Sequence, residues 1–197
     1  MIPELGHFLL IIAAMTALLA PAVVFYGIRR GDDFYAGFSR PASLLTALML
    51  TLSTAALVWA FLTDDFSVAY VANHSNTKLA PAYKAAALWG SHEGSMLLWI
   101  WLMAVGTAGA GFVRCADRLF TARLQGLMLA VLAGFCAFLL FTSNPFLRNL
   151  PMVPPDGRDL NPILQDIGMI LHPPVLFMGY AGLALMFAAM CALLLSG

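Results

Sequence analysis

Long apolar runs separated by polar connections dominate this chain of 197 residues. A helix needs roughly 17 to 25 apolar residues to cross a bilayer. Five runs reach that length, at about residues 8–27, 42–63, 93–113, 124–142 and 173–195. The pattern predicts an all-α membrane protein with about five transmembrane helices, which form one helical domain over residues 1–197.

Composition supports the membrane assignment. Hydrophobic residues make up 61% of the chain and charged residues 10%, with a mean hydropathy of +0.87. A soluble domain would carry about a quarter charged residues. Ten basic and ten acidic residues give a net charge of zero, and no basic patch indicates nucleic acid as a partner. The expected surroundings are a lipid bilayer.

The basic residues are distributed unevenly among the four connections. Six of the ten lie in the two short connections, and the two long ones hold Lys78, Lys84, Arg148 and Arg158. The positive-inside rule places the short connections, with Arg29, Arg30, Arg40, Arg114, Arg118 and Arg123, in the cytoplasm. The N-terminus and both long loops are then expected on the outer side.

The three cysteines indicate neither a disulfide nor a thiolate metal site. Cys115 falls in a predicted cytoplasmic connection, and Cys136 and Cys191 fall inside predicted helices. No pair has metal-ligand spacing. The chain also lacks a CxxCH motif, so it is not itself a c-type cytochrome.

The most distinctive stretch is DGRDLNPILQDIGMILHPPVLFMGYAG, in which His172 precedes Pro173 and Pro174. Proline is best tolerated in the first helical turn, and it pushes the preceding residue out of the α region. We therefore expect His172 at an N-cap position, where the helix dipole disfavours the imidazolium. A neutral imidazole can ligate a metal, although a solvated loop histidine is the simpler interpretation of the composition alone.

The loop before His172 is rich in proline and polar residues. We expect a short helix on the membrane surface from Asp159 to Asp166, opened by Asn161-Pro162. Arg158 and Asp166 would supply polar groups near the histidine.

A second polar cluster, WGSHEG, opens the third predicted helix. Ser91 is expected to cap this helix with Glu93 in its first turn. Two ionisable residues, His92 and Glu93, at the start of an apolar run also suggest a pathway or a ligand site. Trp89 suits the membrane interface, and Trp99 deeper in the helix fits either packing or a flat apolar ligand.

Several spaced motifs together resemble one known family. The runs MIPELGHF, WGSHEGSMLLW, FTSNPF, GRDLNPILQD and HPPVLFMGY are similar to the N-terminal part of the CcmF and NrfE family of bacterial cytochrome c maturation proteins. The resemblance covers essentially the whole chain.

That resemblance implies a heme-handling protein of the cytoplasmic (inner) membrane, with its long loops on the periplasmic side. Heme b would be received from the chaperone CcmE and attached to the CxxCH thiols of apocytochrome c, alongside other maturation proteins such as CcmH. The histidine of the HPP motif, His172, would be an axial ligand of the heme iron. We add Arg158, Trp89, His92, Glu93 and Asp166 as candidate heme contacts, with Arg158 for the propionates.

Some features of the family are missing from this sequence. The family's tryptophan-rich segment, its second external histidine and the histidines of its structural heme are expected beyond residue 197. We therefore expect a truncated form or one piece of a split protein, which would not hold the structural heme or complete a heme lyase alone.

Two other function classes remain open from the sequence. One is a proton- or ion-conducting subunit that uses His92 and Glu93. The other is a structural scaffold that docks maturation proteins through its long loops.

Overall fold

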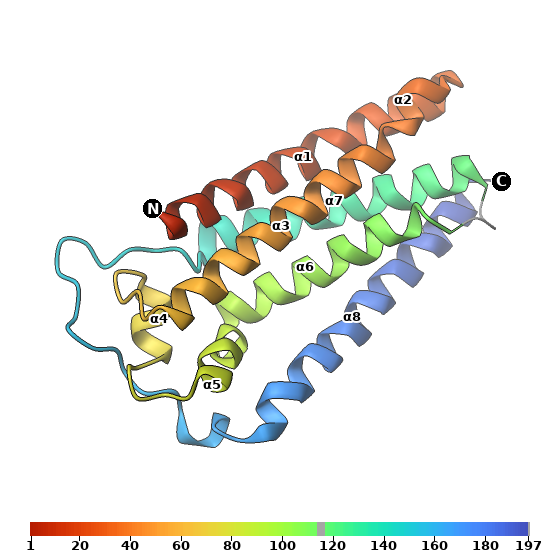
Figure 1. Ribbon diagram of the computed structural model, residues 1–197. Helices are drawn as coiled ribbons and strands as arrows, with labels where there is room; N and C mark the ends of the chain where they lie inside the picture. The colour runs from red at the N-terminus through yellow and green to blue at the C-terminus, as the bar shows by residue number, and fades with distance from the viewer. Residues whose placement is uncertain (114–116, 197) are drawn as a thin grey trace.

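The chain forms a bundle of long helices capped at one end by two folded loops, as a computed structural model shows for residues 1–113 and 117–196 (Figure 1). The long helices are α1 (Ile2–Arg30), α3 (Ser39–Leu62), α6 (His92–Ala110), α7 (Arg118–Thr142) and α8 (Ile167–Leu194). The short elements are the helices α2 (Asp33–Gly37), α4 (Ala69–His74) and α5 (Pro81–Ala86) and the 3-10 turns η1 (Ala87–Trp89) and η2 (Pro162–Leu164). No strand occurs in the described residues, and Arg114 and Cys115 lie outside them.

Four stretches within the described residues are helical, long and apolar enough to cross a membrane. They are Ile2–Arg30, Asp33–Leu62, Arg118–Thr142 and Ile167–Leu194. The prediction of an all-α membrane protein is therefore confirmed. The remaining predicted span, residues 93–113, forms α6, which is not among the four. This helix is 19 residues long and opens with His92, Glu93 and Gly94, and these residues lower its mean hydropathy.

The helices extend beyond the apolar runs that predicted them. Helix α1 begins at Ile2, α7 at Arg118 and α8 at Ile167. Asp117 and Asp166 cap the last two by accepting backbone N–H groups of Phe120 and Gly168. The apolar runs mark the segments suited to lipid, whereas capping residues decide where the helices begin.

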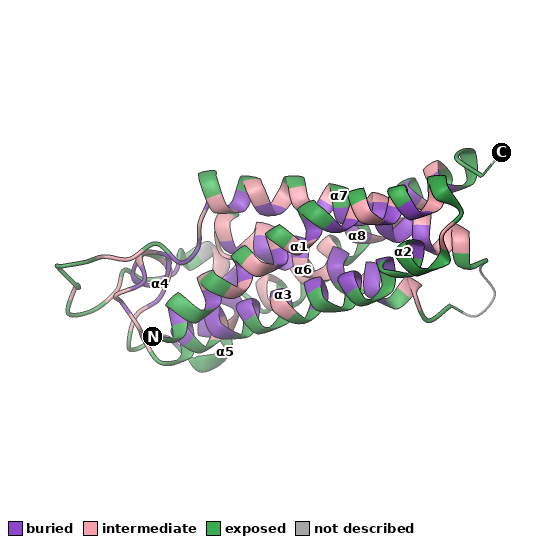
Figure 2. Cartoon of the chain, turned by 90° about the horizontal axis from the view of Figure 1, so that it is seen from above, coloured by how far each residue is buried: buried purple, intermediate pink, exposed green. Residues whose placement is uncertain are grey.

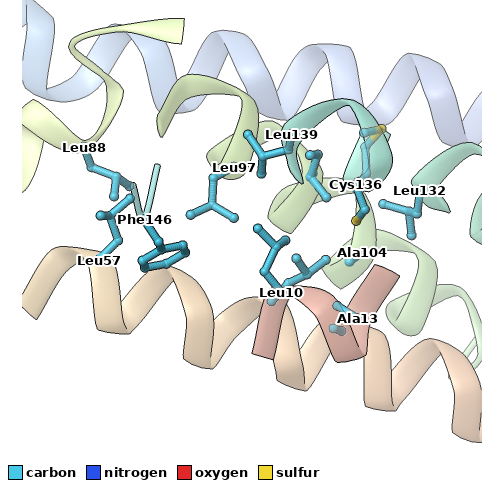
Figure 3. Close-up of a cluster of buried hydrophobic side chains, with 14 of the residues drawn as sticks. Leu10, Ala13, Leu57, Leu88, Leu97, Ala104, Leu132, Cys136, Leu139 and Phe146 are labelled. Atoms are coloured by element: carbon cyan, nitrogen blue, oxygen red, sulfur yellow. The ribbon is translucent and has the colours of Figure 1, made fainter. Parts of the chain in front are cut away.

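Small residues allow the helices to approach closely. The buried face of α1 is built largely from alanine and glycine, and Ser53 of α3 donates a hydrogen bond of 2.8 Å to the Gly6 carbonyl of α1. Leucines from α1, α6 and α7 fill the interior together with Phe146 (Figure 3). Buried residues line the inner faces of the bundle, and the outer faces are exposed (Figure 2). Close packing of small residues is a usual way for membrane helices to associate.

A buried polar network links three helices at the end of the bundle opposite the long loops. The Ser39 hydroxyl donates to Gln125 Oε1 at 2.9 Å, and Gln125 Nε2 donates to the Thr107 carbonyl at 3.1 Å. These residues come from α3, α7 and α6. Because each buried polar atom has a partner, the network avoids a desolvation cost and fixes the register of the helices.

The two long loops fold into one layer, here called the outer layer and defined as residues 63–91 and 143–166. The N-terminus lies at the same end of the bundle, and α2 lies at the other (Figure 1). Val68 pairs with Arg148 in an isolated antiparallel bridge, and the Arg158 amide donates to the Ala72 carbonyl at 2.7 Å. The predicted surface helix from Asp159 to Asp166 is wrong: only the turn η2 forms there, and Asp166 caps α8 instead.

Asp156 and Gly157 fasten the second loop onto the first. Asp156 accepts hydrogen bonds from the amide and hydroxyl of Thr77, at 3.1 and 3.0 Å. The Thr77 amide, followed by the Gly157 amide, lowers the pKa of the Asp156 carboxyl. This contact is therefore kept at neutral pH and lost as the pH falls through that lowered value. Gly157 lies so close to the first loop that an added Cβ would stand 2.0 Å from the Ser75 carbonyl oxygen.

A buried ion pair stabilises the start of the outer layer. Lys84 Nζ donates to both carboxylate oxygens of Asp64, at 2.7 and 2.6 Å. The side chains of Lys84 and Asp64 are only 8% and 24% exposed. Removing one partner of such a shielded pair leaves the other charge poorly solvated, which costs more than the loss of a surface pair.

We expect Gly157→Ala to loosen the outer layer. The added methyl group would collide with backbone rather than with a flexible side chain, so the loop must shift at a cost of about 1 to 3 kcal/mol. Thermal unfolding in detergent and proteolysis of residues 143–166 would measure the change. Gly37→Ala is the matched control, because an added Cβ there meets nothing within 4 Å. Equal stability of both variants would contradict the described loop contact.

We expect Lys84→Met to destabilise the fold by about 1.5 to 3 kcal/mol, the usual loss for a hydrogen bond to a charged group. Lys78→Met is the control, since Lys78 is exposed and its charge is the weakest of the causes that lower the pKa of the exposed Asp156 carboxyl. The measurement is the unfolding midpoint in detergent. A Lys84→Met protein as stable as the Lys78→Met protein would show that the Asp64 pair contributes nothing.

Candidate functional site

His172 lies inside α8, not at its start. Asp166 is the N-cap residue, so His172 falls in the second turn, and the prediction of an N-cap position is wrong. The capping bond from Gly168 to Asp166 starts the helix early enough to include both prolines. The His172 side chain is exposed and makes no hydrogen bond within the described part of the chain. Its ring nitrogens are therefore accessible from outside the bundle.

Trp89 connects the WGSHEG motif to the turn that carries His172. The indole Nε1 donates a hydrogen bond of 2.7 Å to the backbone carbonyl of Met169, 80 residues away in the sequence. Met169 lies four residues before Pro173, and proline has no N–H to donate to that carbonyl. The two motifs singled out in the sequence therefore meet at one hydrogen bond.

The turn before α6 is held rigidly by Tyr70 of α4. The Tyr70 hydroxyl donates to the Leu88 carbonyl at 2.8 Å and accepts from the Ser91 amide at 3.2 Å. Burial raises the pKa of the Tyr70 phenol, so the hydroxyl stays neutral and remains a donor. Gly94 packs directly against this turn, where an added Cβ would lie 1.6 Å from the Leu88 carbonyl oxygen. Only glycine fits there.

His92 and Glu93 lie side by side at the start of α6. His92 Nδ1 is 3.4 Å from Glu93 Oε2, and the two side chains are 66% and 25% exposed. Glu93 Oε2 is buried and has no hydrogen-bond partner among the residues that the structure describes. Ser91 is the N-cap residue as expected, but its side chain makes no capping bond.

Arg158 and Asp166 have separate positions in the outer layer. The Arg158 backbone is tied to Ala72, and its side chain is exposed. The Asp166 carboxylate accepts the Gly168 amide at 2.7 Å, which gives this residue a structural role in starting α8. Arg158 is thus free to reach an external anion, whereas one Asp166 oxygen is already engaged.

An aromatic cluster lies deeper in the bundle, between α6, α7 and α8. The Trp99 ring packs against Phe135 at 4.9 Å and near Tyr180 at 5.9 Å and Phe177 at 6.3 Å between ring centroids. Edge-on and tilted contacts at these distances are typical of stable aromatic packing. Of the two interpretations offered for Trp99, helix packing is the one that these contacts support.

The described residues contain no group of three or more His, Cys, Asp or Glu side chains placed to hold a metal ion. A heme iron needs only axial ligands from the protein, because the porphyrin supplies the other four nitrogens. The exposed, unpartnered imidazole of His172 fits that role. Around it, Leu171 and Val175 expose apolar side chains, at 65% and 66%, as is usual for a helix long and apolar enough to cross a membrane.

Sequence reasoning missed two residues that shape the site. Tyr70 gave no signal, because a tyrosine in a loop has no pattern that predicts a buried hydroxyl bonded to a turn 18 residues later. Gly94 was visible within WGSHEG, but its requirement for glycine follows only from contact with the Leu88 carbonyl. The Trp89 contact with Met169 was likewise beyond the sequence.

Curated relatives match the whole chain. It is 47% identical over 198 aligned residues to the cytochrome c-type biogenesis protein CcmF of Pseudomonas aeruginosa, with 100% of this chain and 30% of that protein covered. The CcmF of Escherichia coli is also 47% identical, with 100% and 31% covered. The NrfE protein of Haemophilus influenzae is 44% identical over 95% of the chain. The chain thus spans about 30% of the length of the curated relatives it matches.

The fold agrees with these relatives. A solved structure titled cytochrome c heme lyase CcmF superposes with a TM-score of 0.80 and 26% identity, covering 95% of this chain and 29% of that one. A family model described as cytochrome C assembly protein matches residues 89–196, a region that begins at Trp89 and includes His172. The chain therefore belongs to the cytochrome c assembly protein family.

Proposed function

We propose that this chain is part of a cytochrome c heme lyase, in which it holds heme b at the outer face of the membrane during attachment to apocytochrome c. Similarity of the whole chain to about 30% of the length of CcmF proteins supports this function. The single structural observation that carries it is the imidazole of His172, which is exposed and has no hydrogen-bond partner among the described residues. It belongs to the second turn of α8, the helix that begins at the end of the bundle where both long loops lie (Figure 1).

In this proposal His172 binds the heme iron through one ring nitrogen and keeps the porphyrin oriented. Each thiol of the apocytochrome then adds across a heme vinyl group: the sulfur bonds to one vinyl carbon, and the thiol hydrogen ends on the other. Axial ligands set the orientation and potential of the iron, and the addition itself belongs to heme and thiol. Arg158 would pair with a propionate.

The assignment of partners and location rests on the same family. Membership in a cytochrome c assembly family, with several apolar helices, supports a membrane location and partners from the maturation system. We propose CcmE as the heme donor, CcmH as a further partner and the inner membrane as the location, with the outer layer in the periplasm. The short connections, rich in arginine, would then face the cytoplasm.

A proton or ion conductor fits the structure less well. A relay needs ionisable groups spaced through the bundle. Among the described residues Lys84 is the buried charged side chain, and it lies in the outer layer rather than in the bundle. His92 and Glu93 lie at the mouth of α6, with apolar residues along the helix below them. The other alternative, a structural scaffold, differs from the proposed function in that a scaffold would bind no heme.

We expect His172→Ala in the complete protein to weaken heme retention at the outer face. Loss of a group that hydrogen-bonds a metal ligand weakens metal sites by roughly 10- to 100-fold, so removing the ligand itself should do at least as much. The measurement is heme absorbance after purification, together with the yield of cytochrome c in cells. His7→Ala is the control histidine: it lies on α1, and its ring is 3.2 Å from the Asn144 side-chain amide. Unchanged absorbance in His172→Ala would remove this residue from the iron and overturn the proposal.

We expect Arg158→Ala to lower heme affinity by roughly two- to fivefold, as for an exposed ion pair. The loss should shrink at high salt, because ions screen exposed charges. Arg29→Ala, at the opposite end of the bundle, should leave heme titrations unchanged. If Arg158→Ala also leaves heme affinity and cytochrome c yield unchanged, the propionate role is wrong.

A further inference from the structure

The two prolines after His172 create a backbone defect in α8. In a regular helix the amide of residue 173 would donate to the carbonyl of Met169. Pro173 has no N–H, and it lies inside the helix rather than in its first turn. An unpaired carbonyl in an apolar setting is costly, and helices with internal proline usually bend or find another donor.

Trp89 supplies the missing donor. Its indole N–H reaches the Met169 carbonyl oxygen at 2.7 Å, a short and favourable distance for this type of bond. Indole can only donate, so it matches a carbonyl that has lost its amide partner. A contact from outside α8 thereby replaces a bond that the helix cannot make for itself.

The donor is itself firmly anchored. The Trp89 carbonyl accepts a hydrogen bond of 3.0 Å from the Ser95 hydroxyl, which ties the residue to the first turn of α6. The preceding residue, Leu88, is buried and bonded to Tyr70. Trp89 therefore holds Met169 from a rigid base, and not from a mobile loop.

His172 depends on that turn for its placement. It lies three residues after Met169 and directly before Pro173, and its side chain has no hydrogen bond of its own in the described structure. We propose that Trp89 is a positioning residue for His172: by bonding the carbonyl left free by Pro173, it fixes the turn of α8 from which the imidazole projects. The expected effect on heme binding rests on the proposed heme role of His172. The effect of Trp89 on the turn of α8 can be tested without heme.

The experiment uses two substitutions and their combination in the complete protein. Trp89→Phe removes the N–H and keeps an aromatic ring. Pro173→Ala restores a backbone amide four residues after Met169, which makes the Trp89 bond dispensable. Trp59→Phe is the matched control, because Trp59 is 54% exposed on α3, away from α8. Circular dichroism and unfolding midpoints verify that all variants are folded.

The first measurement is amide hydrogen exchange over residues 167–172, which reports local opening of the turn independently of heme. We expect Trp89→Phe to raise exchange by roughly 3- to 10-fold, as loss of one hydrogen bond implies. Trp89→Phe with Pro173→Ala should return to the exchange of Pro173→Ala alone. Equal exchange in Trp89→Phe and Trp59→Phe would overturn the inference. So would a rise in exchange in Trp89→Phe that Pro173→Ala does not reverse.

The second measurement is heme affinity and the heme absorption spectrum of the same variants. We expect Trp89→Phe to weaken heme binding and shift the spectrum, and Pro173→Ala to restore both. His172→Ala distinguishes the two levels: if it leaves heme binding unchanged, the proposed function fails while the exchange data still decide whether Trp89 holds the turn. Normal heme binding in Trp89→Phe, with His172→Ala defective, would refute the positioning role.

Discussion

The interior of a lipid bilayer offers no hydrogen-bond partners, so the protein must pair its own backbone N–H and C=O groups. This constraint explains the main features of the structure. Helices meet it internally except at their ends and at proline, where carbonyls or amides are left without partners. Asp117 and Asp166 accept backbone N–H groups at the starts of α7 and α8. Trp89 donates a hydrogen bond to the Met169 carbonyl, for which α8 has no amide at residue 173. The two most distinctive motifs of the sequence, WGSHEG and HPP, are thus joined by a hydrogen bond to a backbone carbonyl.

The outer layer also pairs its backbone groups, but it does so between loops rather than within helices. It has little regular structure, so its backbone groups are paired between the two loops, as in the bonds from Ala69 to Leu147 and from Arg158 to Ala72. Two of its cations are in ion pairs: Lys84 with Asp64 inside the layer, and Arg148 with Glu4 of α1. Such pairing turns two connections into a platform at one end of the bundle. A platform of this kind can present His172 in a defined position.

The placement of His172 shows how local and tertiary effects combine. Proline chemistry alone favours a helix start after the histidine, yet the helix begins five residues before it, because Asp166 caps it and Trp89 compensates for Pro173. This change does not affect the proposal for His172, because its imidazole is exposed and has no hydrogen-bond partner among the described residues, as an iron ligand requires. What changes is the source of its orientation. A helix turn held from outside is more exactly positioned than a residue in a loop.

The sequence by itself determined the helical class, the membrane setting, the approximate extents of the apolar segments and the two motifs of the candidate site, because hydropathy, charge asymmetry and proline spacing are local properties of the chain. It did not determine the beginnings of α7 and α8, the absence of a surface helix before Asp166, or the meeting of Trp89 with Met169. These depend on contacts between residues far apart in sequence, such as Tyr70 with Leu88 and Gly157 with Ser75. Local pattern records which residues prefer lipid or water, whereas only the packed tertiary structure decides which donor reaches which acceptor.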